Sequence, residues 1–180
     1  SYTMDSLAKA LLHFNEAISI DPSYAAPYAG IAEYYNRLAT FGLIPSDECF
    51  AAAKDCAMKA VRLYETLAEA WGALAFATLG ADWNRTESMR LINRALELNP
   101  HSAQVLEWYA QILATGGRLM EANAIIERVI KLDPGSAATY VQQSFYQYLM
   151  RRPEGSQKAT NEALRLDPNT FWGLFAKATG

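Results

Sequence analysis

Apolar residues recur along the chain at steps of three and four, which is the spacing of one face of an α-helix. Five segments show the same series, counted back from residues 22, 65, 100, 134 and 168, which we call the reference points. The members of the series stand two, five, eight and twelve places before each reference point. The places two and five before it hold Ile20, Leu63, Leu98, Leu132, Leu166, and Ala17, Ala60, Ala95, Val129, Ala163. The places eight and twelve before it hold Phe14, Ala57, Ile92, Ile126, Thr160, and Ala10, Ala53, Ser88, Ala122, Ser156. Each series predicts a helix whose repeated positions share one face.

The reference point is an Asp-Pro or Asn-Pro pair in four of the five segments. Pro100, Pro134 and Pro168 stand 34 residues apart, Pro22 ends an earlier copy, and Glu65 replaces the proline in the remaining one. A proline cannot continue a helix, so it marks where each helix ends. A fixed period of this length is typical of arrays of small helical units.

A second helix is predicted after each reference point. A bulky residue is followed four places later by a small one, which lets two helices approach closely. These pairs are Tyr28 and Ala32, Trp71 and Ala75, Leu106 and Ala110, Tyr140 and Ser144, Leu174 and Ala178. The pattern thus predicts helices near 4–20, 24–40, 47–63, 67–80, 85–98, 102–115, 119–132, 136–150, 154–166 and 170–179, and no strand.

The sequence departs from the repeat at three places. About nine extra residues separate the first two helices of the first complete unit. Trp83 stands in a turn that is polar in the other units, where we expect it to seal the end of a helix pair. The fourth unit has Gln143, Gln147, Ser156 and Thr160 at places that are apolar or small elsewhere, so we expect it to pack more loosely.

The units resemble the tetratricopeptide repeat family, above all in "GGRLMEANAIIERVIKLDP" at 116–134. The resemblance implies an all-α fold, a right-handed α-α superhelix of about ten antiparallel helices. We expect 1–180 to be a single solenoid fragment, with the second helix of a truncated unit at 4–20. Units follow at about 24–65, 67–100, 102–134 and 136–168, and the first helix of a further unit at 170–179.

The long first turn, the turn with Trp83 and the "RALELNP" segment look similar to one arrangement within the family. It occurs in the C-terminal regions of bacterial winged-helix transcriptional regulators, Ser/Thr kinases and adenylate cyclases. The resemblance implies that the chain is the regulatory or sensor part of a larger signalling protein. Its effector domain would then lie upstream.

Binding is expected on the concave side of the solenoid, which the first helix of each unit lines. The mapped positions carry acidic and polar residues with aromatic ones on both sides, and no Lys or Arg. The candidate binding residues are Glu33, Asn36, Glu69, Phe76, Gln104, Glu107, Gln111, Phe145 and Tyr148. The aromatic members could equally pack against the neighbouring unit.

The charge of these positions indicates the kind of partner. Chaperone-binding members of the family hold a terminal carboxylate with Lys, Arg and Asn, whereas Glu33, Glu69 and Glu107 would repel one. A neutral or basic peptide, or an apolar helix of a partner protein, fits better. The main prediction is therefore a protein- or peptide-binding scaffold, and the alternative is a domain that senses a small molecule in the same groove.

Composition and motifs argue against several other classes of function. The chain has 16 Lys and Arg against 19 Asp and Glu, a net charge of −3, so direct binding of nucleic acid is not expected. No apolar stretch is long enough to span a bilayer, and we expect no membrane contact and a cytoplasmic location. Phosphate-binding loops and metal-binding motifs do not occur, so neither an enzyme nor a cofactor or metal is predicted. Cys49 and Cys56 are too far apart on one predicted helix to form a disulfide with each other.

The C-terminal segment is strongly apolar. Phe171, Trp172 and Phe175 stand there with almost no charged neighbour. The end of a solenoid is normally polar, so this segment predicts either a following unit in the parent protein or a homodimer formed through this end.

Overall fold

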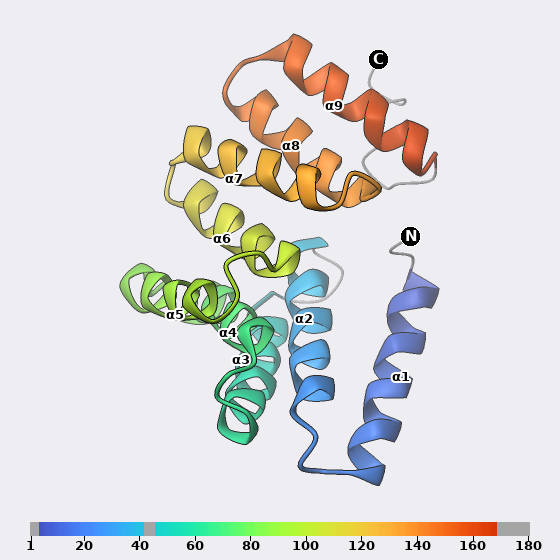
Figure 1. The fold of residues 1–180 in the computed structure, drawn as a ribbon, viewed down its shortest axis with the longest axis vertical. Coiled ribbons are helices and arrows are strands. Elements are labelled where there is room, and N and C mark those ends of the chain that lie inside the picture. Colours follow the sequence, from blue (N-terminus) through green and yellow to red (C-terminus); the bar gives the residue numbers. More distant parts are fainter. Residues whose placement is uncertain (1–3, 42–45, 169–180) are drawn as a thin grey trace. The chain divides into compact units, whose positions relative to one another are not determined.

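The computed structural model describes residues 4–41 and 46–168, and within that part it contains nine α-helices and no strand (Figure 1). The all-α prediction is confirmed. The nine helices agree with the first nine predicted ranges to within two residues at either end. The tenth predicted helix, at 170–179, lies outside the described residues.

The helices form two compact units, and the boundary between them falls inside one helix, after Trp108. The first unit holds α1 (Met4–Ile20), α2 (Ala25–Phe41), α3 (Ser46–Leu63), α4 (Ala68–Asp82), α5 (Arg85–Leu98) and the start of α6 (Ala103–Thr115). The second unit holds the rest of α6, α7 (Leu119–Leu132), α8 (Ala137–Leu149) and α9 (Pro153–Leu166). The predicted grouping into repeats, including a single array over 1–180, stays a prediction.

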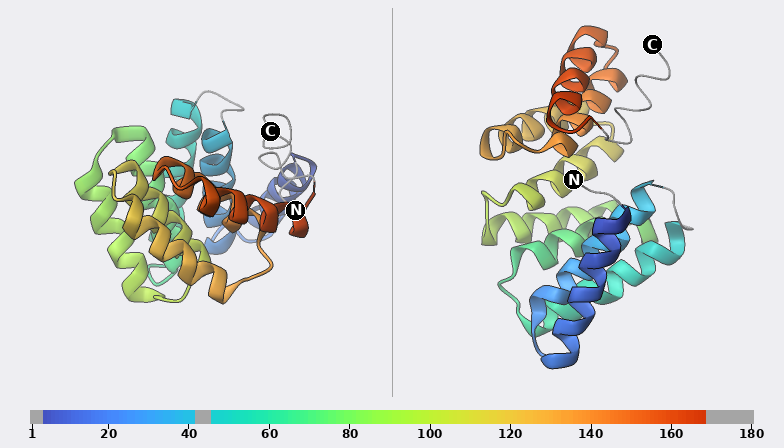
Figure 2. Two further views of the ribbon diagram at one scale, coloured as in Figure 1. Left: turned by 90° about the horizontal axis from the view of Figure 1, so that it is seen from above. Right: turned by 90° about the vertical axis from the view of Figure 1, so that its right-hand side faces the viewer.

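Successive helices of the first unit pack side by side as antiparallel pairs (Figures 1 and 2). α2 contacts α1, α3 and α4, and α4 also contacts α5. The repeated small residues lie at these contacts, as the sequence predicts: Ala32, Ala53 and Ala75 are completely buried. Ser88 is also buried, and its hydroxyl donates a hydrogen bond of 2.8 Å to the carbonyl of Ala75.

Two glycines bring aromatic rings against a helix backbone. The ring of Phe14 in α1 covers Gly30 of α2, and the ring of Phe50 in α3 covers Gly80 of α4. A Cβ atom at either glycine would overlap the ring. These two close approaches therefore require glycine and fix the distance between the helices.

The residue before three of the four repeated prolines forms a local hydrogen bond where its helix ends. Asp21, Asn99 and Asp133 each accept a backbone N–H bond through Oδ1, from the residue two places later, at 2.9, 3.2 and 3.1 Å. The bonds from Ser23, side chain first and then backbone, hold the pKa of Asp21 below its usual value. The Asp and Asn residues of the repeat thus build the turn itself.

One of the repeated apolar positions does not belong to the core. The residue two places before the proline was expected on the same buried face as the others, but Ile20 is 85% exposed and Leu132 is 50% exposed. Leu63 is 38% exposed and Leu98 and Leu166 are half-buried, so this position lies at the edge of the buried face, where the helix is ending. The buried face of these helices therefore consists of the positions five, eight and twelve places before the proline.

Three turn residues that stand 34 residues apart have left-handed backbone conformations. They are Trp83, Gly117 and Arg151, with φ of 52°, 78° and 57°. Glycine adopts this conformation without strain, whereas Trp and Arg do not. The prediction that Trp83 seals a helix pair is wrong, because its side chain is 77% exposed.

The second unit has two kinds of core. α6, α7 and α8 share an apolar cluster in which Leu113, Ile126 and Tyr146 are buried. Between α8 and α9 the contact is polar: the Ser144 hydroxyl lies 3.0 Å from the hydroxyl of Ser156 and 2.7 Å from that of Thr160. Few side chains of α8 and α9 are fully buried, which agrees with looser packing of this last pair.

Candidate binding surface

The centre of the candidate surface is an arginine that α2 places among carboxylates of two helices. Arg37 forms a 2.7 Å ion pair with Glu33, one helical turn earlier, and its guanidinium lies 3.7 Å from Glu107 of α6. The three side chains are only 13%, 23% and 17% exposed. Because partial burial reduces solvent screening, this pairing is stronger than one on an open surface.

An aromatic group lies beside these charges. The guanidinium carbon of Arg37 is 5.6 Å from the centre of the Trp108 ring, a distance at which a cation is attracted to the ring face. Trp108 stacks on Phe76 of α4 with ring centres 4.7 Å apart, and Phe76 meets Phe50 edge to face at 5.8 Å. Phe76 is 7% exposed, so it supports the surface from beneath.

Hydrogen bonds tie the first helices of successive pairs to one another. Gln104 of α6 donates to Glu33 of α2 through its side-chain amide. Ser102, just before α6, donates through its hydroxyl to Glu69 of α4 at 2.9 Å. Glu33 and Glu107 therefore share one polar network through Arg37, and Glu69 is tied separately to the residue before α6.

Asn36 lies under this network and is completely buried. Its amide nitrogen donates a 3.0 Å bond to the carbonyl of Ala73 in α4. Its Oδ1 atom and the Nε1 atom of Trp108 are buried and have no hydrogen-bond partner among the described residues. An unpaired buried polar atom costs about 1–3 kcal/mol, so this region is not optimised for stability alone.

The second unit holds the other candidates. Gln111 of α6 is half-buried, whereas Phe145 and Tyr148 of α8 are 48% and 69% exposed. These two aromatic side chains therefore face solvent within their unit. Phe171, Trp172 and Phe175, the predicted terminal interface, lie outside the described residues.

Two members of the surface are not among the residues predicted from the sequence. Arg37 is the neighbour of the predicted Asn36 and brings a cation to a surface on which none was expected. Trp108 stands one position after the predicted Glu107. Residues three and four places apart share a helix face, so Arg37 can lie on the same face as Glu33 just as Asn36 does. The opposite charges of Glu33 and Arg37 would have indicated that Arg37 belongs to the surface.

Other reactive side chains have ordinary surroundings. Burial, reinforced by neighbouring carboxylates, raises the pKa of Cys49 and Cys56, so both thiols stay neutral. His13 is exposed beside Glu16, and His101 is exposed at a helix start. The described ranges contain no cluster of three or more potential metal ligands. In that same part of the chain, no helix is long and apolar enough to cross a membrane.

Comparison with solved structures identifies the fold. The chain superimposes on a thermophilic TPR protein of Thermus thermophilus with a TM-score of 0.76, at 15% identity, over 96% of this chain and 89% of that one. The chain has the tetratricopeptide repeat fold. It is also similar to YrrB, described as a TPR protein with an unusual peptide-binding site, with a TM-score of 0.60 at 23% identity over 97% and 84% of the two chains.

A sequence relative is a regulator. Over 148 residues the tetratricopeptide repeat chain is 30% identical to the transcriptional regulator HilA of Salmonella typhimurium, and HilA of Salmonella typhi matches equally well. The match covers 82% of this chain and 26% of HilA, so the chain spans about a quarter of the length of the curated relatives it matches. No family model matches the chain.

Proposed function

We propose that the chain is a non-catalytic protein- or peptide-binding region of a bacterial transcriptional regulator. The observation that carries the binding part is that Glu33, Glu69 and Glu107 stand on three successive first helices, α2, α4 and α6, and that each is bound to a residue of, or next to, a neighbouring first helix. Three carboxylates with one arginine between two of them leave a net negative surface. Such a surface attracts a neutral or basic segment of a partner.

The regulatory part of the proposal is supported by the similarity to HilA. A regulator of transcription acts in the cytoplasm, so the proposal places this chain there. The regulatory part predicts that the whole protein containing Ser1–Gly180 also has a DNA-binding domain. Sequencing the complete reading frame tests this prediction. A parent protein without any effector domain would contradict the regulatory part and leave the binding part standing.

Selection from a random peptide library tests the binding part. Peptides that the chain enriches should carry Lys or Arg and should lose about tenfold in affinity when Glu69→Gln and Glu107→Gln are combined. Glutamine keeps the shape of both side chains and removes only their charge. Glu87→Gln combined with Glu97→Gln removes the same charge from α5, and this matched control should leave the affinity unchanged.

Two results would count against this site. One is a selected set without excess positive charge. The other is an equal loss of affinity for the Glu87→Gln/Glu97→Gln control and the Glu69→Gln/Glu107→Gln variant, since this would indicate a general effect of net charge. No observation among the described residues favours a small-molecule sensor, so we do not propose one.

A further inference from the structure

The turn between α8 and α9 has an arginine where the preceding repeat has a glycine. At Gly117 and at Arg151 the same two hydrogen bonds close the turn: Gly117 and Arg118 donate to Ala114 and Leu113, and Arg151 and Arg152 donate to Tyr148 and Gln147. This is the Schellman ending, whose left-handed residue is normally glycine. A left-handed arginine costs about 1–2 kcal/mol more than glycine there. The chain therefore keeps this arginine at the expense of stability.

Arg151 and Arg152 also differ from other arginines of the chain in their charge environment. Arg90, Arg118 and Arg165 each form an ion pair with a glutamate three residues away, at 2.6, 2.5 and 2.9 Å. No carboxylate of the described residues lies within ion-pair distance of Arg151 or Arg152. The Arg152 guanidinium instead approaches the sulfur of Met120 at 3.4 Å. Two adjacent exposed cations thus keep their capacity to bind carboxylates.

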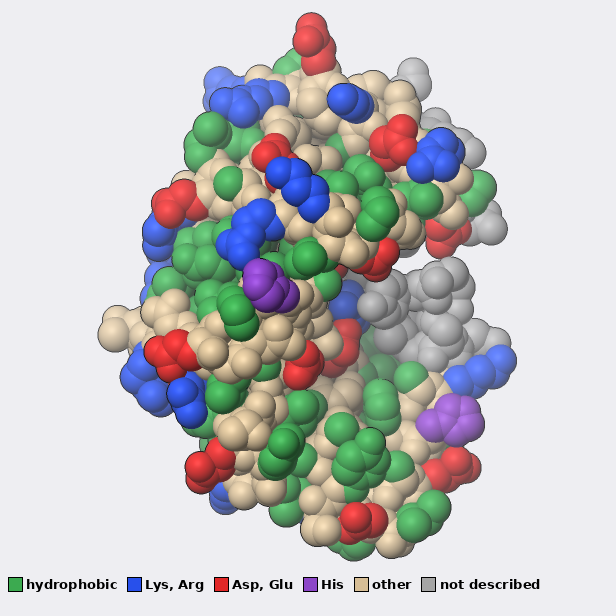
Figure 3. Space-filling view, in the orientation of Figure 1, with side chains coloured by type: hydrophobic (Ala, Val, Ile, Leu, Met, Phe, Trp, Pro, Cys, Tyr) green, Lys and Arg blue, Asp and Glu red, His purple; other side chains and the backbone are tan. Residues whose placement is uncertain are grey.

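Exposed apolar side chains lie next to this pair of arginines. Tyr148 is 69% exposed and Leu149 is 43% exposed. Together with Arg151, Arg152 and Pro153 they line a shallow depression of about 360 Å³. On the face in Figure 3, basic and hydrophobic side chains lie together over the α8–α9 turn. We call these five residues the turn surface.

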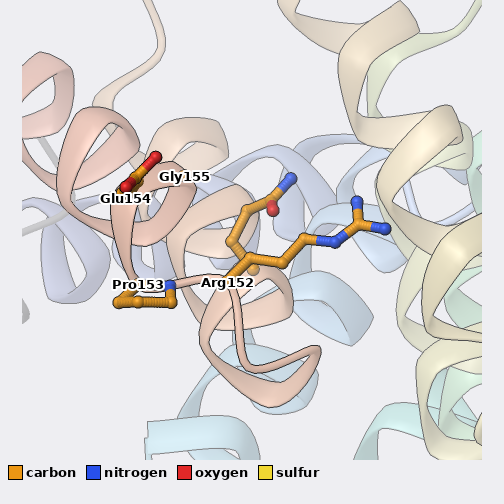
Figure 4. A pocket seen from close by; sticks show the side chains of 5 residues that line it. Arg152, Pro153, Glu154 and Gly155 are labelled. Atoms are coloured by element: carbon orange, nitrogen blue, oxygen red, sulfur yellow. The ribbon is translucent and has the colours of Figure 1, made fainter.

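A second depression, of about 350 Å³, adjoins the turn surface and shares Arg152 and Pro153 with it. Its other lining residues are Gln147, Glu154 and Gly155. Figure 4 shows that the Arg152 side chain extends away from the start of α9, while Pro153 and Glu154 both lie on the side opposite to its guanidinium. The carboxylate closest in sequence therefore does not occupy the space beside the guanidinium.

We propose that the turn surface binds an acidic segment of a partner protein in which an apolar residue stands between carboxylates. Arg151 and Arg152 bind the carboxylates, and the apolar residue fills the depression beside Tyr148 and Leu149. Tyr and Arg are the residue types that contribute most at protein interfaces. A nucleic-acid backbone fits less well, because it requires an extended row of cations rather than two in a chain of net charge −3. This proposal does not rest on the acidic surface of the first unit.

Peptide selection on variants of the whole chain tests the proposal. A random peptide library is selected on the natural chain, and the enriched peptides are tested on Arg151→Gln/Arg152→Gln and on Arg151→Gly. The matched control is Arg90→Gln/Arg94→Gln, which removes the same charge from α5. We expect a set of peptides rich in Asp and Glu, with Leu or an aromatic residue, that binds about tenfold more weakly to both turn variants and equally well to the control.

The Arg151→Gly variant separates binding from folding, because glycine relieves the strain of the turn. Its expected combination of a higher unfolding midpoint with weaker peptide binding cannot come from a folding defect. The proposal is wrong if no acidic peptides are enriched, or if they bind the turn variants and the natural chain equally. It is also wrong if a single-stranded or duplex oligonucleotide binds this surface more tightly than the acidic peptides at the same salt concentration.

Discussion

At the scale of single residues, Gly80 sets the closest approach between α3 and α4. We expect Gly80→Ala to destabilise the chain by about 1–3 kcal/mol, since the added methyl group overlaps the ring of Phe50. Alanine normally stabilises a helix relative to glycine by about 0.5–1 kcal/mol, so a loss is diagnostic of this contact. Urea denaturation gives the free energy of unfolding.

The Phe50→Ala variant is the appropriate background for a control. Once the ring is absent, Gly80→Ala should be neutral or stabilising. If the substitution is equally harmful with and without the ring, the described contact between α3 and α4 is not the cause.

The left-handed conformation of Arg151 lowers the stability of the turn between α8 and α9. Arg151→Gly should raise the free energy of unfolding by about 1 kcal/mol, and Gly117→Arg, at the equivalent position, should lower it by a similar amount. Paired urea titrations of the two variants measure both changes. Opposite changes are the expected result, and a change of the same sign in both variants would show that the two turns differ in backbone conformation.

Buried Cys49 makes stability depend on pH in the alkaline range. Burial raises the pKa of its thiol above the value of about 8.5 that it has in the unfolded chain. The favourable contribution of the neutral thiol is complete below that value and is lost as the pH rises through the folded pKa. Cys49→Ala should therefore lose less stability between pH 8 and pH 10 than the natural chain, as measured by thermal unfolding. An identical loss would show that this thiol does not ionise on unfolding.

At the scale of helices, nine of the ten predicted helices lie in the described residues, and several of them could be placed because they end at a local signal. Asp21, Asn99 and Asp133 close their helices with their own side chains, so the end of each helix depends on two adjacent residues. The exposure of Ile20 and the direction of Trp83 could not be predicted in the same way. Both depend on whether a neighbouring helix covers the end of the helix. The spacing of apolar residues within one helix gives no information about its neighbours.

The helices should also differ in local stability. Ten of the residues of α4 between Ala68 and Leu79 are buried. In α9 only Ala159 and Ala163 are buried. We expect backbone amides of α8 and α9 to exchange with deuterium faster than those of α4, because opening the last pair exposes less apolar area. Hydrogen exchange followed by mass spectrometry measures this order. Equal protection of the two regions would indicate that the polar contact between α8 and α9 is as stabilising as an apolar one.

At the scale of the whole molecule, the fold could be predicted from the 34-residue period, and the binding surface only in part. Glu33, Glu69 and Glu107 follow from the repeat, since each stands on the first helix of a pair. The spacing of Arg37 from Glu33 within α2 could have indicated Arg37, but its place beside Glu107 and Trp108 could not be predicted from one helix at a time. Their contacts join α2 to α6, and such contacts depend on how the helices of different repeats pack.

The central claim is that the first helix of each pair presents the surface that binds a partner. Nuclear magnetic resonance of the isotope-labelled chain tests it most directly, with a basic peptide from the library as ligand. The predicted result is that backbone amide shifts change along one face of α2, α4 and the start of α6, around Glu33, Glu69 and Glu107. Changes confined to α3 and α5, the second helices of the same pairs, would contradict the account.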